Sequence, residues 1–118
     1  MDKQECQRRT KRFGLDVNAL IRNLPTDVVS AQVARKLVES CTGVGANYRH
    51  ACRAKPIADF ISKMGTVEEE GDDSLYWLEV LVEGRFVAQK AVDRLLDEGD
   101  QLLRMAVASI NTARGDSR

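Results

Sequence analysis

The sequence has few of the residues that interrupt helices and few of those that favour strands. Its 118 residues include two prolines, Pro25 and Pro56, and aromatic residues make up only 5% of the chain. Hydrophobic residues make up 43% and charged residues 31%, a balance that favours helices over strands. Because a chain of this length holds one hydrophobic core, we expect a single domain over residues 1–118.

Long apolar runs and an excess of either charge are also missing. No run approaches the ~18 consecutive apolar residues of a membrane-spanning helix, and the first residues carry no apolar signal core. We therefore expect a cytoplasmic protein with no membrane partner. Eighteen basic residues balance eighteen acidic ones, so any attraction to nucleic acid must come from local patches.

Cysteine and histidine are too few and too scattered for a metal site. Cys41 and Cys52 lie eleven positions apart on one expected helix. That spacing is roughly 16 Å, which is beyond the reach of a disulfide. Since no Cys-x-x-Cys pair occurs, we expect Cys6, Cys41 and Cys52 to be reduced thiols and no metal to be bound. The single histidine, His50, lacks the Glu-x-x-His context of a ferritin-like di-iron site.

Apolar residues recur at helical intervals in four successive segments, which predicts an all-α, antiparallel up-down-up-down four-helix bundle. The expected helices cover about residues 5–24, 27–54, 56–83 and 88–112. Pro25 ends the first helix, and Thr26 or Asp27 caps the second. Pro56 starts the third helix after a very short connection, so the second and third helices form an antiparallel hairpin.

The predicted core consists of one apolar stripe on each helix. The stripes comprise Phe13, Val17, Leu20, Ile21 and Leu24; Val29, Val33, Leu37, Cys41, Val44, Tyr48 and Cys52; Ile57, Phe60, Ile61, Met64, Val67, Gly71, Leu75, Leu78 and Val82; and Val92, Leu95, Leu96, Gly99, Leu102, Leu103, Ala106, Val107 and Ile110. Folding the hairpin about Lys55 places Lys36 opposite Ser74. Small residues fill positions 40–46. We expect them to allow close contact with a neighbouring helix, and the alternative is that they leave room for a ligand.

Residues 75–82 are apolar nearly all the way round the third helix, with Glu79 as the one charge. A helix of this kind is buried on more than one side. We therefore expect a second surface, such as another subunit, to cover this face of the helix. The candidate interface residues are Tyr76, Trp77 and Val80. The alternative is that the loop with Phe86 and Val87 folds back over them.

Carboxylate pairs offer the one enzymatic alternative. Glu70 with Asp73, and Asp97 with Asp100, have the spacing by which magnesium-dependent helical nucleotide pyrophosphohydrolases bind their metal. Solvated faces and salt bridges are the simpler explanation in a chain so rich in charge. No nucleophile elbow, phosphate-binding glycine loop or dinucleotide fingerprint occurs, so we expect no catalytic residue, no cofactor and no enzyme.

Basic residues gather at the start of the first helix and at the hairpin end. Such patches meet the phosphate oxygens of nucleic acid, and an oligomer would repeat them by symmetry. The candidate nucleic-acid-binding residues are Arg8, Arg9, Arg12, Arg49, Arg53 and Lys55. The alternative is that they only solubilise helix ends, where Arg49 and Arg53 complement the helix dipole.

Three motifs carry a family resemblance. The motifs are Thr42–Ala54 (TGVGANYRHACRA), Ala58–Lys63 (ADFI-x-K), and a third within residues 67–79 that consists of VEEE at 67–70 and DS-x-YWLE at 73–79. Together they resemble the four helix bundle proteins related to 23S rRNA intervening-sequence proteins, over about residues 13–113. The family's most recognisable polar and aromatic positions correspond to Asn47, Tyr48, Arg49, Glu70, Tyr76 and Glu79.

The resemblance implies a bacterial homo-oligomer, typically a pentamer, whose role in the family is largely unresolved. A related branch, the accessory proteins of diversity-generating retroelements, binds nucleic acid and a reverse transcriptase. The balanced charge of this chain departs from the most basic members. We expect a non-enzymatic scaffold or accessory factor that binds structured RNA or a nucleic-acid enzyme, with a purely structural protein–protein interaction module as the alternative.

Overall fold

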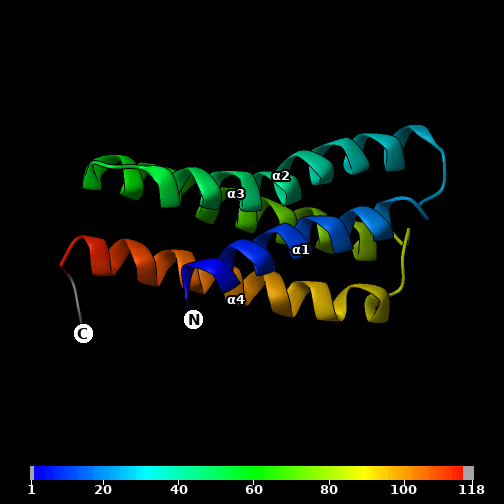
Figure 1. The fold of residues 1–118 in the computed structure, drawn as a ribbon. Coiled ribbons are helices and arrows are strands. Elements are labelled where there is room, and N and C mark those ends of the chain that lie inside the picture. The colour runs from blue at the N-terminus through cyan, green and yellow to red at the C-terminus, as the bar shows by residue number, and fades with distance from the viewer. Residues whose placement is uncertain (1, 116–118) are drawn as a thin grey trace.

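The computed structural model describes residues 2–115, and four helices account for most of them. The helices are α1 (Lys3–Ile21), α2 (Val28–Arg53), α3 (Ile57–Glu83) and α4 (Gln89–Ala113). They run antiparallel in chain order in a body of 46 × 23 × 20 Å (Figure 1). α1 packs on α2, α2 on α3 and α3 on α4, and α4 returns to α1 through the smallest of these interfaces. The predicted all-α four-helix bundle is confirmed.

The helix boundaries follow from local hydrogen bonds. α1 ends at Ile21, before the predicted residue 24. After Arg22, the amides of Asn23 and Leu24 bond in turns to the carbonyls three residues back, those of Leu20 and Ile21. Asp27 caps α2 as predicted. Its carboxylate accepts a hydrogen bond from the Ser30 amide at 2.9 Å, and the Ser30 hydroxyl accepts one from the Asp27 amide at 3.4 Å.

A Schellman turn ends α3. Arg85 adopts the left-handed conformation, with φ of 66°. The Phe86 amide then donates to the Leu81 carbonyl at 2.9 Å, and the Arg85 amide donates to the Val82 carbonyl at 3.0 Å. This turn brings Phe86 and the following Val87 back against the core, where both are partly buried.

The predicted interface on α3 is exposed only in part. Trp77 and Val80 are partly buried and pack against the core of their own chain, as do Phe86 and Val87 of the loop. Tyr76 is 57% exposed, and its ring meets the Trp77 ring edge-on with 4.9 Å between centroids. The returning loop proposed as the alternative is therefore packed on the core, and Tyr76 is the member of the predicted interface that stays open to solvent.

Most of the predicted stripes are buried or partly buried, but two of their members are not. Val29 is 57% exposed, because Ser30 takes the inward position at the start of α2 and donates its hydroxyl to the Pro25 carbonyl. Ile57 is 60% exposed in the first turn of α3. Placing these two residues in the core was wrong.

The register of the α2–α3 hairpin explains the exposure of Ile57. Ser74 lies opposite Ser40, with 3.1 Å between the hydroxyl oxygens, and not opposite Lys36. The difference is about one helical turn. The first turn of α3 therefore extends past the end of α2, and Pro56 precedes the helix as its N-cap and is not its first residue.

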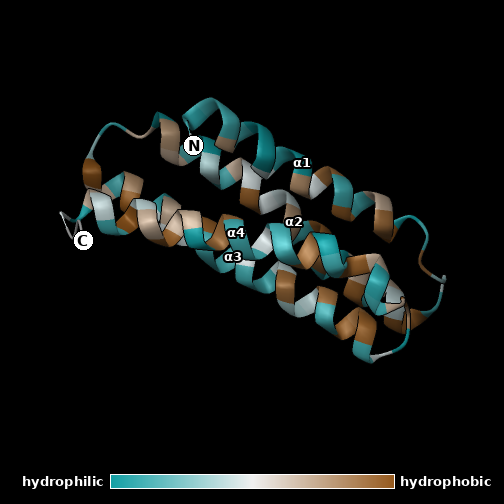
Figure 2. Ribbon diagram, turned by 90° about the horizontal axis from the view of Figure 1, so that it is seen from below, coloured by the Kyte–Doolittle hydropathy of each residue, from teal (hydrophilic) through white to brown (hydrophobic). Residues whose placement is uncertain are grey.

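The first half of α1 contributes buried residues that the apolar pattern did not indicate. Cys6 and Thr10 are buried there, as is Gly14 just beyond the midpoint of the helix. Figure 2 shows that this half of α1 is mostly hydrophilic, which hides its inner face in the sequence. The Thr10 hydroxyl is accommodated there because it donates to the Cys6 carbonyl at 2.8 Å.

Candidate nucleic-acid interface

Glycines allow α1 and α2 to pack closely against one another. A Cβ atom on Gly14 would lie 3.0 Å from the Cys41 carbonyl oxygen, and one on Gly45 would lie 3.2 Å from the Lys11 amide nitrogen. Both neighbours are backbone atoms, which cannot move aside cheaply. The close helix contact predicted from the small residues at positions 40–46 is confirmed for Gly45, whereas Gly43 instead faces the carboxylate of Glu70 on α3.

A groove of about 620 Å³ lies over this glycine floor, between α1 and α2. Four cationic side chains line it: Arg8 and Lys11 from α1, and Arg49 and Arg53 from α2. The lining residues, all from the described part of the chain, include no aspartate or glutamate. The groove therefore concentrates positive charge that no wall residue neutralises.

The groove unites the two basic patches that the sequence analysis treated separately. Among the candidate residues, Arg8 comes from the first patch, and Arg49 and Arg53 come from the hairpin end. Lys11 also belongs to the first basic patch, although it was not among the candidate binding residues, and it joins them in the lining. Lys55 is exposed in the connection after α2 and does not line the groove.

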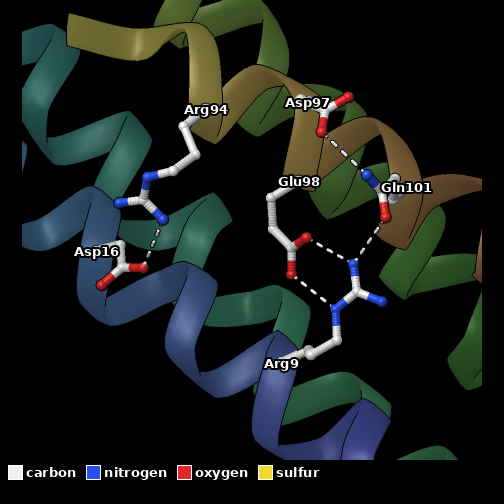
Figure 3. Close-up of polar contacts among 6 residues, drawn as sticks. All are labelled: Arg9, Asp16, Arg94, Asp97, Glu98 and Gln101. Atoms are coloured by element: carbon white, nitrogen blue, oxygen red, sulfur yellow. Dashed lines mark hydrogen bonds and ion pairs between the residues drawn. The ribbon is translucent and has the colours of Figure 1, made fainter. Parts of the chain in front are cut away.

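Arg9 points instead toward α4. Its Nε donates to Glu98 Oε2 at 2.9 Å, its Nη2 donates to the other carboxylate oxygen, and Nη2 also reaches Gln101 Oε1 at 3.1 Å (Figure 3). The hydrogen bond to Glu98 raises the pKa of Arg9 despite partial burial, which acts in the opposite direction. This charge-assisted, bidentate pair ties α1 to α4.

Arg12 is also engaged with a carboxylate. It lies 3.8 Å from Asp16, one turn further along α1. Asp16 in turn lies 3.7 Å from Arg94 of α4, as Figure 3 shows. The structure thus divides the candidate arginines of α1 between the groove (Arg8) and the α4 side (Arg9 and Arg12).

The Cys41 thiol is unsuited to nucleophilic chemistry. Cys6, Cys41 and Cys52 are all free, as predicted, and the first two are buried. Burial raises the pKa of Cys41 to about 12, so its reactive thiolate form is scarce at neutral pH. Burial also raises the pKa of Tyr48, and hydrogen bonding with the thiols of Cys52 and Cys6 adds to this effect.

The carboxylate pairs form no assembled metal site among residues 2–115, where no group of three or more His, Cys, Asp or Glu side chains is positioned to hold an ion. Glu70 and Asp73 lie on α3, and Asp97 and Asp100 on α4. Asp100 is engaged by Arg104 at 2.9 Å on the outer face of α4. The magnesium alternative therefore gains no ligand set from this part of the structure.

None of the four described helices is long and apolar enough to cross a membrane. Fold and groove together define an antiparallel four-helix bundle with a basic groove between its first two helices.

A solved structure shares this architecture. It is the crystal structure of a Bacteroides thetaiotaomicron protein of unknown function from the S23 ribosomal protein family. The two folds match with a TM-score of 0.81 and 22% sequence identity, over 89% of this chain and 97% of the other. No protein-family model matches the chain, and no curated protein is significantly similar to it. At this identity the match shows a shared fold, and the family of the matched protein is the one that the motifs of this chain resemble.

Proposed function

We propose that this protein is a non-enzymatic scaffold that associates with copies of itself and binds the backbone of structured RNA through the α1–α2 groove. One observation carries the proposal: the groove holds the side chains of Arg8, Lys11, Arg49 and Arg53 and no carboxylate. Contacts between such cations and phosphates supply much of the affinity of proteins for nucleic acid. They position the protein on the backbone without reading the base sequence.

The balanced net charge of the chain does not oppose this role, because the charges are separated in space. On α3 the exposed side chains include Glu69, Asp72, Asp73 and Glu79. The groove, by contrast, lies between α1 and α2. At physiological salt the screening length is about 8 Å, so an approaching phosphate responds mainly to the nearest charges and little to the total.

Self-association is proposed through the outer face of α3. Tyr76 is 57% exposed and rests against Trp77, so an apolar surface continues from solvent into the core at this point. Aromatic side chains of this kind are enriched at protein interfaces. The family resemblance suggests five copies, which would present the groove repeatedly and strengthen RNA binding through multivalency.

The deciding experiment is a titration of structured RNA at two salt concentrations. We expect affinity to fall as salt rises, and the double variant Arg49→Gln/Arg53→Gln to reduce the slope of log K against log salt by about two units for two lost contacts. The matched control is Arg94→Gln/Arg104→Gln, which removes two exposed arginines from α4. Absence of binding at low salt, or equal behaviour of the two double variants, would refute the RNA proposal.

Light scattering tests the assembly separately. We expect a mass several times that of the 13.2 kDa chain, and a lower mass for Tyr76→Ala. An oligomer that binds no RNA would instead indicate a purely structural interaction module. A monomer would contradict the proposed self-association.

A further inference from the structure

A second hollow lies between α2 and α3 at the hairpin end. Its volume is about 360 Å³, and the residues that line it are His50, Arg53, Ala54, Asp59, Ser62 and Lys63. Arg53 also lines the α1–α2 groove. The two hollows therefore meet at the last turn of α2, one on each flank of that helix.

The second hollow adds one further cation, Lys63, and one carboxylate, Asp59, to the charges that line the groove. Arg53 and Lys63 are cationic, Ser62 offers a hydroxyl, and Asp59 is the one carboxylate among the lining residues. Asp59 lies in the first turn of α3, where a carboxylate offsets the positive end of the helix dipole. Lys55 is exposed in the connection between the two helices.

We infer that the groove and the second hollow hold the two phosphate backbones of one double-helical nucleic acid, with the last turns of α2 between them. The inference rests on the proposed function of the groove. An α-helix with its side chains is about 10–12 Å across. The major groove of B-form DNA is about 12 Å wide and admits such a helix, and A-form RNA presents a wide, shallow minor groove. A duplex offers two rows of phosphates at a fixed separation, one for each flank of α2, whereas a single strand offers one row.

The composition of the two hollows also favours a duplex over a single strand. Their lining residues include no tryptophan, tyrosine or phenylalanine. Proteins that bind single strands without sequence preference stack bases on aromatic side chains. Cations beside a single ring, that of His50, instead suit the outside of a double helix, where the bases are already stacked on one another. The recognised chemistry is thus a pair of backbones, which RNA and DNA duplexes share.

The test compares Lys63→Gln with the wild type on three ligands: an RNA duplex, a DNA duplex of the same sequence, and single-stranded RNA. Lys63 lines only the second hollow, and it is exposed, so its replacement should not affect folding. The matched control is Lys90→Gln, an exposed lysine in the first turn of α4. Wild-type protein should bind at least one duplex about tenfold more tightly than the single strand.

We expect Lys63→Gln to weaken duplex binding several-fold, to reduce its salt slope by about 0.9, and to leave single-strand binding unchanged. A loss on both duplexes assigns the paired backbones themselves as the ligand, and a loss on RNA alone assigns the A-form duplex. Equal wild-type affinity for duplex and single strand, or equal behaviour of Lys63→Gln and Lys90→Gln, overturns the duplex inference and leaves the RNA proposal standing. No binding of any ligand at low salt overturns both.

Discussion

The two flanks of α1 use arginine and lysine in opposite ways. On the α2 flank, the backbones meet at Gly14, and Arg8 and Lys11 line a groove without carboxylates. On the α4 flank, Arg9 binds Glu98, and Asp16 faces Arg94. The comparison teaches that a cation on this bundle is structural where a carboxylate stands opposite, and is available to a ligand where none does.

Adjacent residues fall on different flanks because of helix geometry. Successive side chains of an α-helix are rotated by about 100°, so Arg8 and Arg9 point to different neighbours. The charge of the two residues is the same. The Glu98 carboxylate balances the charge of Arg9. The groove that Arg8 lines has no carboxylate, so the charge of Arg8 can attract phosphate.

Breaking the α2 flank should have the largest effect. Gly14→Val places side-chain atoms against the Cys41 carbonyl, so the two backbones must separate. We expect the free energy of unfolding to fall by about 2 kcal/mol, as for other overpacked sites. The control is Gly65→Val on α3, where a Cβ meets nothing within 4 Å and stability should change by no more than about 0.5 kcal/mol. Equal losses in urea unfolding would contradict the close-packed seam.

Exchanging the two adjacent arginines for glutamine sharpens the comparison directly. Arg9→Gln removes the pair with Glu98, whose two side chains are 24% and 28% exposed, and should lower stability by about 1 kcal/mol, less at high salt. Arg8→Gln should change stability by less than about 0.5 kcal/mol. RNA binding should show the reverse order, with Arg8→Gln the weaker binder. If the same variant shows the larger loss in both stability and RNA binding, the contrast between the two flanks is contradicted.

The smallest expected effect concerns Glu70, whose carboxylate lacks a partner such as the one that Arg9 provides for Glu98. Burial raises the pKa of Glu70, and Asp73, Glu69 and Glu39 raise it further. The charged form is therefore disfavoured in the folded state, so stability falls as pH rises through the raised pKa and returns on acidification. Glu70→Gln should be slightly more stable than wild type at pH 7, with the difference closing toward about pH 4, near the pKa of an unfolded glutamate.

Urea midpoints at the two pH values measure this difference. A matched control is Glu79→Gln, an exposed glutamate further along α3 that is not one of the carboxylates acting on Glu70. If Glu70→Gln lowers the midpoint at pH 7, the Glu70 charge is stabilising, and the unfavourable environment described for it over Gly43 is wrong.

The sequence predicted the bundle well because its signals are local. Apolar residues at helical spacing marked four helices, and Asp27 marked the start of α2 through a capping interaction within one turn. Val29 and Ile57 were misplaced because their burial depends on what lies opposite them. For Ile57 that is the end of α2, which falls about one turn short of it.

The sequence predicted which cationic residues belong to the candidate site, but not that they come together in one groove. Arg8, Arg49 and Arg53 were identified as cations, but their union in one groove depends on how α1 and α2 pack at Gly14 and Gly45. Lys63 was noted only as the last residue of the motif Ala58–Lys63 and not as a site residue, because its pocket lies between two helices and shares Arg53 with the groove.

The sequence by itself determined where the helices lie and that neighbours in the chain run antiparallel, since both follow from periodicity, capping and short connections within a few residues. The tertiary structure alone decided which basic residues are neutralised. Glu98 lies 89 positions from Arg9 in the chain, yet its carboxylate bonds to the guanidinium. Electrostatic interactions depend on distance and on solvent exposure, and only the packing of the helices sets both.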